Sequence, residues 1–112
     1  MNTTSRRPLF LGVLLMLAAS AGFAATPAEN WKAQCASCHG VDGKGQGTAS
    51  KEIKLRDYTD PKVQAALSDE HIIKATAEGV ILDGKEMMQA YKNDLSTREI
   101  KGLVAHIRRF KK

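Results

Sequence analysis

The chain has 112 residues, of which 43% are hydrophobic and 26% are charged, and its formal net charge at pH 7 is +5. This length and composition fit one small globular domain and leave no room for a second. The 17 basic residues stand against 12 acidic ones, without the dense basic patch interleaved with aromatic residues that is typical of nucleic-acid binding. The composition therefore favours a single globular domain and argues against a nucleic-acid partner.

The first residues are typical of a secretory signal peptide. Arg6 and Arg7 form a short positive region, residues 9–19 are almost all apolar, and residues 20–25 are mostly small. This order of positive, apolar and small residues predicts export of the chain. The arginine pair also permits a twin-arginine signal, which would mean export of an already folded protein.

We expect the signal peptide to be cleaved after Ala24, because Gly22 and Ala24 then occupy the positions three and one before the cut. Residues 1–24 are thus the predicted signal peptide, and residues 25–112 are the predicted mature domain. The alternative is an uncleaved anchor, since the apolar run approaches the length that spans a bilayer.

The mature domain opens with a predicted helix. Thr26 is placed as its N-cap, Pro27 stands at its first position, and Glu29 completes a capping box. The helix is expected to run to about Cys38. Residues 40–51 follow as a loop, because closely spaced glycines interrupt any helical pattern.

Two short helices are expected next. Asp60 and Pro61 begin one, while Ser68 begins the other and Gly79 ends it. Residues 80–95 show neither a helical nor an alternating pattern, which predicts a loop. A loop of that length in so small a domain is usually functional or disordered.

The last helix begins with a second capping box, formed by Ser96 and Glu99. Apolar residues follow at helical spacing, including Ile100, Leu103 and Ile107. The sequence therefore predicts an all-α domain with about four helices and no strand.

Cys35, Cys38 and His39 have the spacing Cys-x-x-Cys-His, which is associated with covalent haem attachment. Two thiols about one helical turn apart can add to the two vinyl groups of one porphyrin. The adjacent histidine is then held where its imidazole meets the iron. We therefore predict thioethers from both cysteines and iron ligation by His39.

Three other kinds of site share parts of this pattern. A thioredoxin-like dithiol is expected within a βαβ pattern, which the sequence lacks. A structural zinc site needs a fourth ligand, and His71 and His106 lie far from the usual spacing. The glycines at 43–47 fit no phosphate-binding motif. Haem attachment remains the interpretation that uses all three residues.

The residues alone do not decide which side chain is the distal ligand of the iron. Met87 and Met88 lie in the long predicted loop, where no core position explains two methionines. His71 is expected to be solvated and His106 to be a packing residue of the last helix. Ligation by two histidines would give a lower potential than ligation by histidine and methionine.

The chain resembles the small class I c-type cytochromes over essentially all of the mature domain. The resemblance is carried by CASCHG at residues 35–40, DYTDPKVQAALSDEHIIKATAEGV at residues 57–80 and MQAYKNDLSTREIKGLVAHIRRF at residues 88–110. It implies a cytochrome c fold, with about four helices packed around one covalently attached haem c.

The resemblance also implies particular roles. In that family the distal ligand is a methionine followed three positions on by an aromatic residue, which implies Met88 with Tyr91. Trp31, four residues before the first cysteine, implies packing of the first helix on the last. Relatives commonly have a proline where this chain has Gln89 and an aromatic residue where it has His106.

The function implied by the resemblance is single-electron transport between redox protein partners in the bacterial periplasm, without enzymatic activity. After signal cleavage we expect no membrane span, and a monomer or transient complexes. Relatives receive haem outside the cytoplasmic membrane on an unfolded chain, which implies Sec export.

Three further expectations concern partners and rivals. The alternative function is a tightly bound cytochrome subunit of a larger dehydrogenase or terminal reductase. A haem domain that binds a small gas is a second rival. Lys44, Lys85 and Lys92 are candidates for a face that docks acidic partners, or they are simply solvated surface residues.

Overall fold

The structure, a computed structural model, describes residues 7–14 and 24–112. The predicted signal peptide, residues 1–24, lies for the most part outside the described residues, and its cleavage stays a prediction. Within the described ranges, no helix is long and apolar enough to cross a membrane.

The first helix is one continuous element with a wider turn in its middle. It is made of α1 (Pro27–Asn30), a π-helical segment η1 (Trp31–Cys35) and α2 (Ala36–His39). Single π turns inside α-helices are rare and often lie at functional sites. This one ends at Cys35, the first residue of the predicted attachment motif.

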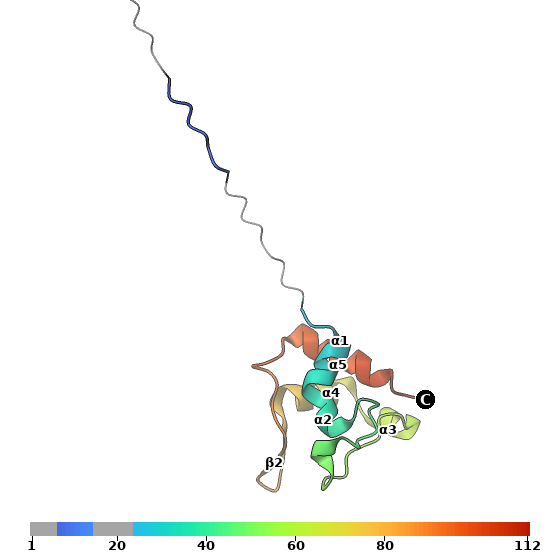
Figure 1. Cartoon of the computed structure of the whole chain (residues 1–112). Coiled ribbons are helices and arrows are strands. Elements are labelled where there is room, and N and C mark those ends of the chain that lie inside the picture. Colours follow the sequence, from blue (N-terminus) through green and yellow to red (C-terminus); the bar gives the residue numbers. More distant parts are fainter. Residues whose placement is uncertain (1–6, 15–23) are drawn as a thin grey trace, which may run out of the picture.

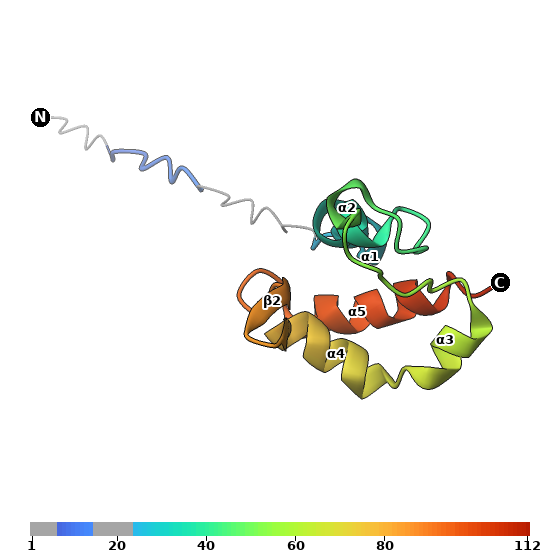
Figure 2. The same ribbon diagram turned by 90° about the horizontal axis from the view of Figure 1, so that it is seen from below.

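The other helices follow in the predicted order. A 3₁₀ turn, η2 (Thr48–Ser50), lies in the loop after the first helix, and α3 (Pro61–Ala66), α4 (Asp69–Glu78) and α5 (Thr97–Arg108) complete the helical set. In Figure 2, α4 and α5 run side by side, and the first helix packs across α5.

Each predicted helix start is capped by a side chain, as the sequence predicts. The acceptor oxygens belong to Thr26, Asp60, Ser68 and Ser96, and the donating backbone N–H groups belong to Glu29, Lys62, His71 and Glu99. The capping box at the start of α5 is complete, because the Glu99 side chain also accepts from the N–H of Ser96.

The prediction of a loop over residues 80–95 is wrong for residues 80–88, whereas residues 89–95 contain no helix or strand, as predicted. The strands β1 (Val80–Leu82) and β2 (Lys85–Met88) form an antiparallel hairpin, visible at one end of the domain in Figures 1 and 2. Asp83 and Gly84 have φ angles of 52° and 76°, and Asp-Gly with positive φ at both positions is typical of a type I′ hairpin turn. The domain is therefore helical with a small two-stranded sheet, which is consistent with the predicted all-α class without confirming it.

The core lies where the first helix crosses α5. Leu103 is 1% exposed and Trp31 is 3% exposed. The Trp31 ring centroid lies 5.6 Å from that of His106 and 5.0 Å from that of Phe110. The expected packing of Trp31 on the last helix is confirmed, and so is the expectation that His106 is a packing residue.

Arg108, at the end of α5, fixes the corner between α3 and α4. Its guanidinium donates to the backbone carbonyls of Gln64 at 2.9 Å and Leu67 at 2.6 Å. The Gln64 side chain in turn donates to the carbonyl of Ile107 at 2.9 Å. The corner also positions Leu67 and the first turns of α4, which line a large cavity in the domain.

Candidate functional site

A cavity of about 590 Å³ opens between the first helix, the segment after it, α4, the hairpin and α5. Its volume is in the range of cofactor and ligand sites in proteins. Five of the candidate residues from the sequence line this cavity. They are the possible attachment and ligand residues of the motif and the hairpin, namely Cys35, Cys38, His39, Met87 and Met88. Folding thus brings together two segments that lie far apart in the sequence.

Most of the remaining lining is apolar. It includes Trp31, Ile53, Leu55, Leu67, Ile72, Val80, Leu103 and Ile107. Such a surface excludes water and suits a large flat apolar group. The charged side chains in the lining are Lys54, Arg56 and Glu86, and His71 also lines the cavity.

The two cysteines are not joined by a disulfide, and Cys35 is buried. Burial, with a smaller contribution from nearby Cys38, raises the pKa of the Cys35 thiol to about 11. The attacking thiol of a redox dithiol has the opposite property, a pKa below that of free cysteine. The environment of this pair therefore argues against a disulfide oxidoreductase.

His39 is the last residue of α2, and two aromatic rings hold its imidazole. The ring centroids of Trp31 and Tyr58 lie 5.7 Å and 5.5 Å from it, and the Tyr58 ring is stacked at 22°. Burial lowers the pKa of His39. The imidazole is therefore neutral at neutral pH, which is the form that binds a metal.

The Nδ1 atom of His39 is buried and has no hydrogen-bond partner in the part of the chain that the structure describes. Metal-binding histidines usually donate this N–H to a carbonyl or carboxylate that fixes the ring. Here aromatic packing on Trp31 and Tyr58 orients the ring instead. A neutral, half-buried imidazole, two thiols and an apolar cavity form a donor set that fits haem.

Met87 and Met88 are the last two residues of β2, and both lie on the side of the cavity. In the register Val80 pairs with Met88 and Ile81 pairs with Glu86, which leaves Met87 as the extra residue of a bulge. A bulge interrupts the alternation of side chains along a strand. Both methionines are half-buried and line the cavity, and Met88 also packs against the buried core.

The end of α4 holds the methionine segment in place. Gly79 has a φ of +77°, and a Cβ atom added there would lie 2.5 Å from the carbonyl oxygen of Met88. The backbone N–H of Tyr91 donates to the carbonyl of Thr76 at 3.0 Å. The sequence predicts Gly79 as a helix stop, and the structure adds that it permits this close approach.

Two histidines considered as alternative ligands lie in different places. His71 is exposed, as expected, yet it borders the cavity, whereas His106 packs on Trp31 and borders a smaller cavity elsewhere. Sequence reasoning missed Tyr58, whose ring stacks on His39. No pattern around residues 51–59 could have found it, because the contact is tertiary.

A helical domain whose Cys-x-x-Cys-His motif faces methionines across one apolar cavity defines the class of c-type cytochromes. Residues 22–107 match the family described as cytochrome c oxidase, cbb3-type, subunit III. The match spans more than half of the chain, which therefore belongs to this family.

Solved structures support the same class. The chain is similar to the KustC0563 c-type cytochrome, with a TM-score of 0.69 and 35% identity over 79% of this chain and 100% of that one. A mutant of KustC0563 gives a TM-score of 0.66 and 34% identity over 78% of this chain and 100% of that one. Among curated proteins, no match was found.

The protein is thus a small monohaem c-type cytochrome with a cytochrome c-like fold. Its cofactor is one covalently bound haem c, and its function is electron transfer. The residues that line the cavity are compatible with that cofactor in both chemistry and burial.

Proposed function

We propose that this protein carries single electrons between redox protein partners in the periplasm. Cys35 and Cys38 hold the haem through thioethers, His39 is the proximal ligand and Met88 is the distal ligand. The observation that carries the proposal is the shared cavity, onto which the motif of the first helix and the methionines of the hairpin converge.

Each of these residues has a physical task. The thioethers fix the cofactor to the first helix, and the rings of Trp31 and Tyr58 orient His39. The thioether sulfur of Met88 is a soft ligand that favours ferrous iron, which raises the potential relative to two imidazoles. When bound, the haem supplies the one-electron couple of its iron.

Ligation by His39 and Met88 favours a carrier over an enzyme. With His39 and Met88 both holding the iron, no position would remain for a substrate or gas. The test is a potentiometric titration of the exported holoprotein, followed by addition of carbon monoxide to the reduced form. We expect a reversible one-electron transition and no spectral change with carbon monoxide. A large spectral change would overturn the carrier function in favour of a gas-binding domain.

Export through Sec with cleavage after Ala24 is part of the same proposal. It is supported by the order of residues 6–25 and by the class, since c-type cytochromes are generally extracytoplasmic. The mass and N-terminal sequence of the protein from a periplasmic fraction would test it. A chain that begins at Ala25 is expected, and a full-length chain in the membrane fraction would contradict it.

A second candidate is a cytochrome subunit tightly bound in a larger dehydrogenase or terminal reductase. The description of the matched family, which names a subunit of an oxidase, favours this role. KustC0563, which the chain matches over its full length, is described as a c-type cytochrome, and this description names no larger complex. Size exclusion of a native periplasmic extract separates the two, because a free carrier elutes at its own small mass.

Lys44, Lys85 and Lys92 form the proposed docking face for acidic partners. Lys85 and Lys92 are exposed and Lys44 is half-buried. Charges of this kind raise association rates at low ionic strength. A rate of electron transfer that does not change with salt would leave these lysines as ordinary surface residues.

A further inference from the structure

One buried ring connects His106 with the proposed proximal ligand. The Trp31 ring centroid lies 5.7 Å from that of His39 and 5.6 Å from that of His106. The indole Nε1 atom of Trp31 donates a hydrogen bond of 3.0 Å to the carbonyl of Gly40, the residue after His39. The Trp31 ring therefore lies against both imidazoles, so that a charge on His106 is separated from His39 by one aromatic side chain.

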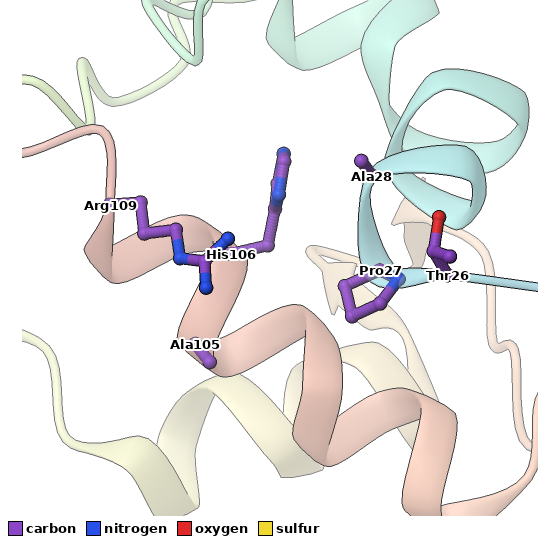
Figure 3. A pocket seen from close by; sticks show the side chains of 6 residues that line it. All are labelled: Thr26, Pro27, Ala28, Ala105, His106 and Arg109. Atoms are coloured by element: carbon purple, nitrogen blue, oxygen red, sulfur yellow. The ribbon is translucent and has the colours of Figure 1, made fainter.

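His106 also has access to solvent. It is half-buried and borders a cavity of about 190 Å³ between the start of α1 and the end of α5. In Figure 3 its imidazole projects from α5 into the space between Arg109 and the first turn of α1. A proton can thus reach this side chain from bulk water without entering the haem cavity.

Few charges face His106. Among the described residues its charged neighbour is Arg109, which directly follows α5, and burial followed by the Arg109 charge lowers the pKa of His106. The first helix contributes Thr26, Pro27 and Ala28 to the cavity, and none of these titrates. Trp31 and Phe110 contribute only uncharged rings.

The predicted signal cleavage adds one more charge. It would create an α-amino group at Ala25, next to Thr26 at the rim of the small cavity. That positive charge would act on His106 in the same direction as Arg109.

We propose that proton binding at His106 is coupled to the oxidation state of the iron through Trp31, so that the midpoint potential falls as the pH rises through the His106 titration. The proposal rests on the proposed function, because it takes His39 as the proximal ligand. His106 does not touch the haem in this proposal, and its charge acts on the iron from the far side of Trp31. It makes the electron affinity of the site depend on pH.

The sign follows from electrostatics. Oxidation adds a positive charge at the iron, and a protonated His106 repels it across the low-dielectric interior. The reduced protein, which has taken one electron from its donor, therefore binds a proton from solvent at His106 more tightly than the oxidised protein. We expect the proton affinity to differ about threefold or more between the two states.

The test is a potentiometric titration of the mature holoprotein at several values between about pH 5 and pH 8. In the wild type the potential is expected to fall with rising pH, and in His106→Phe this slope should disappear. In Arg109→Gln the slope should persist but move to higher pH, because removal of a nearby positive charge strengthens proton binding at His106. A purely structural role for His106 would not produce the shift in Arg109→Gln.

Three results would overturn the proposal: a wild-type potential that does not depend on pH, a slope that survives in His106→Phe, or a slope that disappears in His71→Gln and so belongs to His71. Should His106→Phe fail to fold, His106→Gln and Arg109→Gln still decide the question. Failure of the proposed function gives a different result, since the wild type would then show no reversible one-electron transition at all.

Discussion

The hydroxyl of Tyr91 donates a hydrogen bond of 2.8 Å to the backbone carbonyl of Gln34, and so joins the two halves of the haem site. Gln34 directly precedes Cys35, and Tyr91 stands three residues after Met88. The Tyr91 side chain is 8% exposed, and burial, as the largest cause, raises its pKa. The hydroxyl therefore stays protonated at neutral pH and remains a donor.

Tyr91→Phe should lower the free energy of unfolding of the holoprotein by about 1 kcal/mol, because the Gln34 carbonyl loses a buried donor. Denaturant unfolding followed by the haem absorbance measures this. The spectrum of the folded variant should stay close to that of the wild type. An unchanged free energy of unfolding would show that the hydrogen bond contributes nothing to joining the two segments.

Arg108→Lys should destabilise the protein by about 1.5–3 kcal/mol, because an ammonium cannot replace the fork that reaches the carbonyls of Gln64 and Leu67. Asp69→Asn is the matched control. The Arg108 to Asp69 ion pair is exposed, with 60% of the Asp69 side chain accessible, and such pairs are worth about 1 kcal/mol or less. If both variants lose the same free energy of unfolding in thermal or denaturant unfolding, the loss in Arg108→Lys does not come from the contacts with the carbonyls.

Met88→Ala should weaken the long-wavelength absorption band that is typical of ferric Met-ligated haem and should lower the midpoint potential. Met87→Ala, its neighbour in the bulge, should keep both properties. Absorption spectra and potentiometric titrations of the two variants provide the measurement. The reverse pattern would assign the distal ligand to Met87.

Glu99→Gln should reduce the loss of stability in acid. The pKa of Glu99 is lowered from 4.5, first by the hydrogen bond from the Asn30 side chain and then by that from the Ser96 backbone. A carboxyl with a lowered pKa in the folded state stabilises the protein above its unfolded pKa, and this stabilisation is lost as the pH falls through the folded value. Unfolding curves from neutral pH to below about pH 4 should therefore be flatter for the variant, and parallel curves would contradict this.

Local signals made the helices predictable. The caps at Asp60, Ser68 and Ser96 act on neighbouring N–H groups, so the sequence alone could place them. The motif at Cys35 to His39 is equally local, since one helical turn brings its residues together. These elements depend little on the rest of the fold.

The features that the sequence did not reveal depend on tertiary contacts. Strands of three and four residues are too short to show alternation, and only the Asp83-Gly84 turn could have indicated the hairpin. The bulge at Met87 and the stacking of Tyr58 on His39 need the assembled domain. The distal half of the site was therefore the harder half to predict.

The central claim is that Cys35 and Cys38 each bind the haem through a thioether. The most direct measurement is the pyridine haemochrome spectrum of the exported protein, combined with extraction by acidified acetone, for the wild type, Cys35→Ala and Cys38→Ala. We predict that haem stays with the wild-type chain and shows two saturated vinyl groups, and that each variant gives little holoprotein, with one thioether in what remains. Haem that extracts from the wild type, or a Cys35→Ala protein with normal yield and an unchanged spectrum, would contradict the assignment.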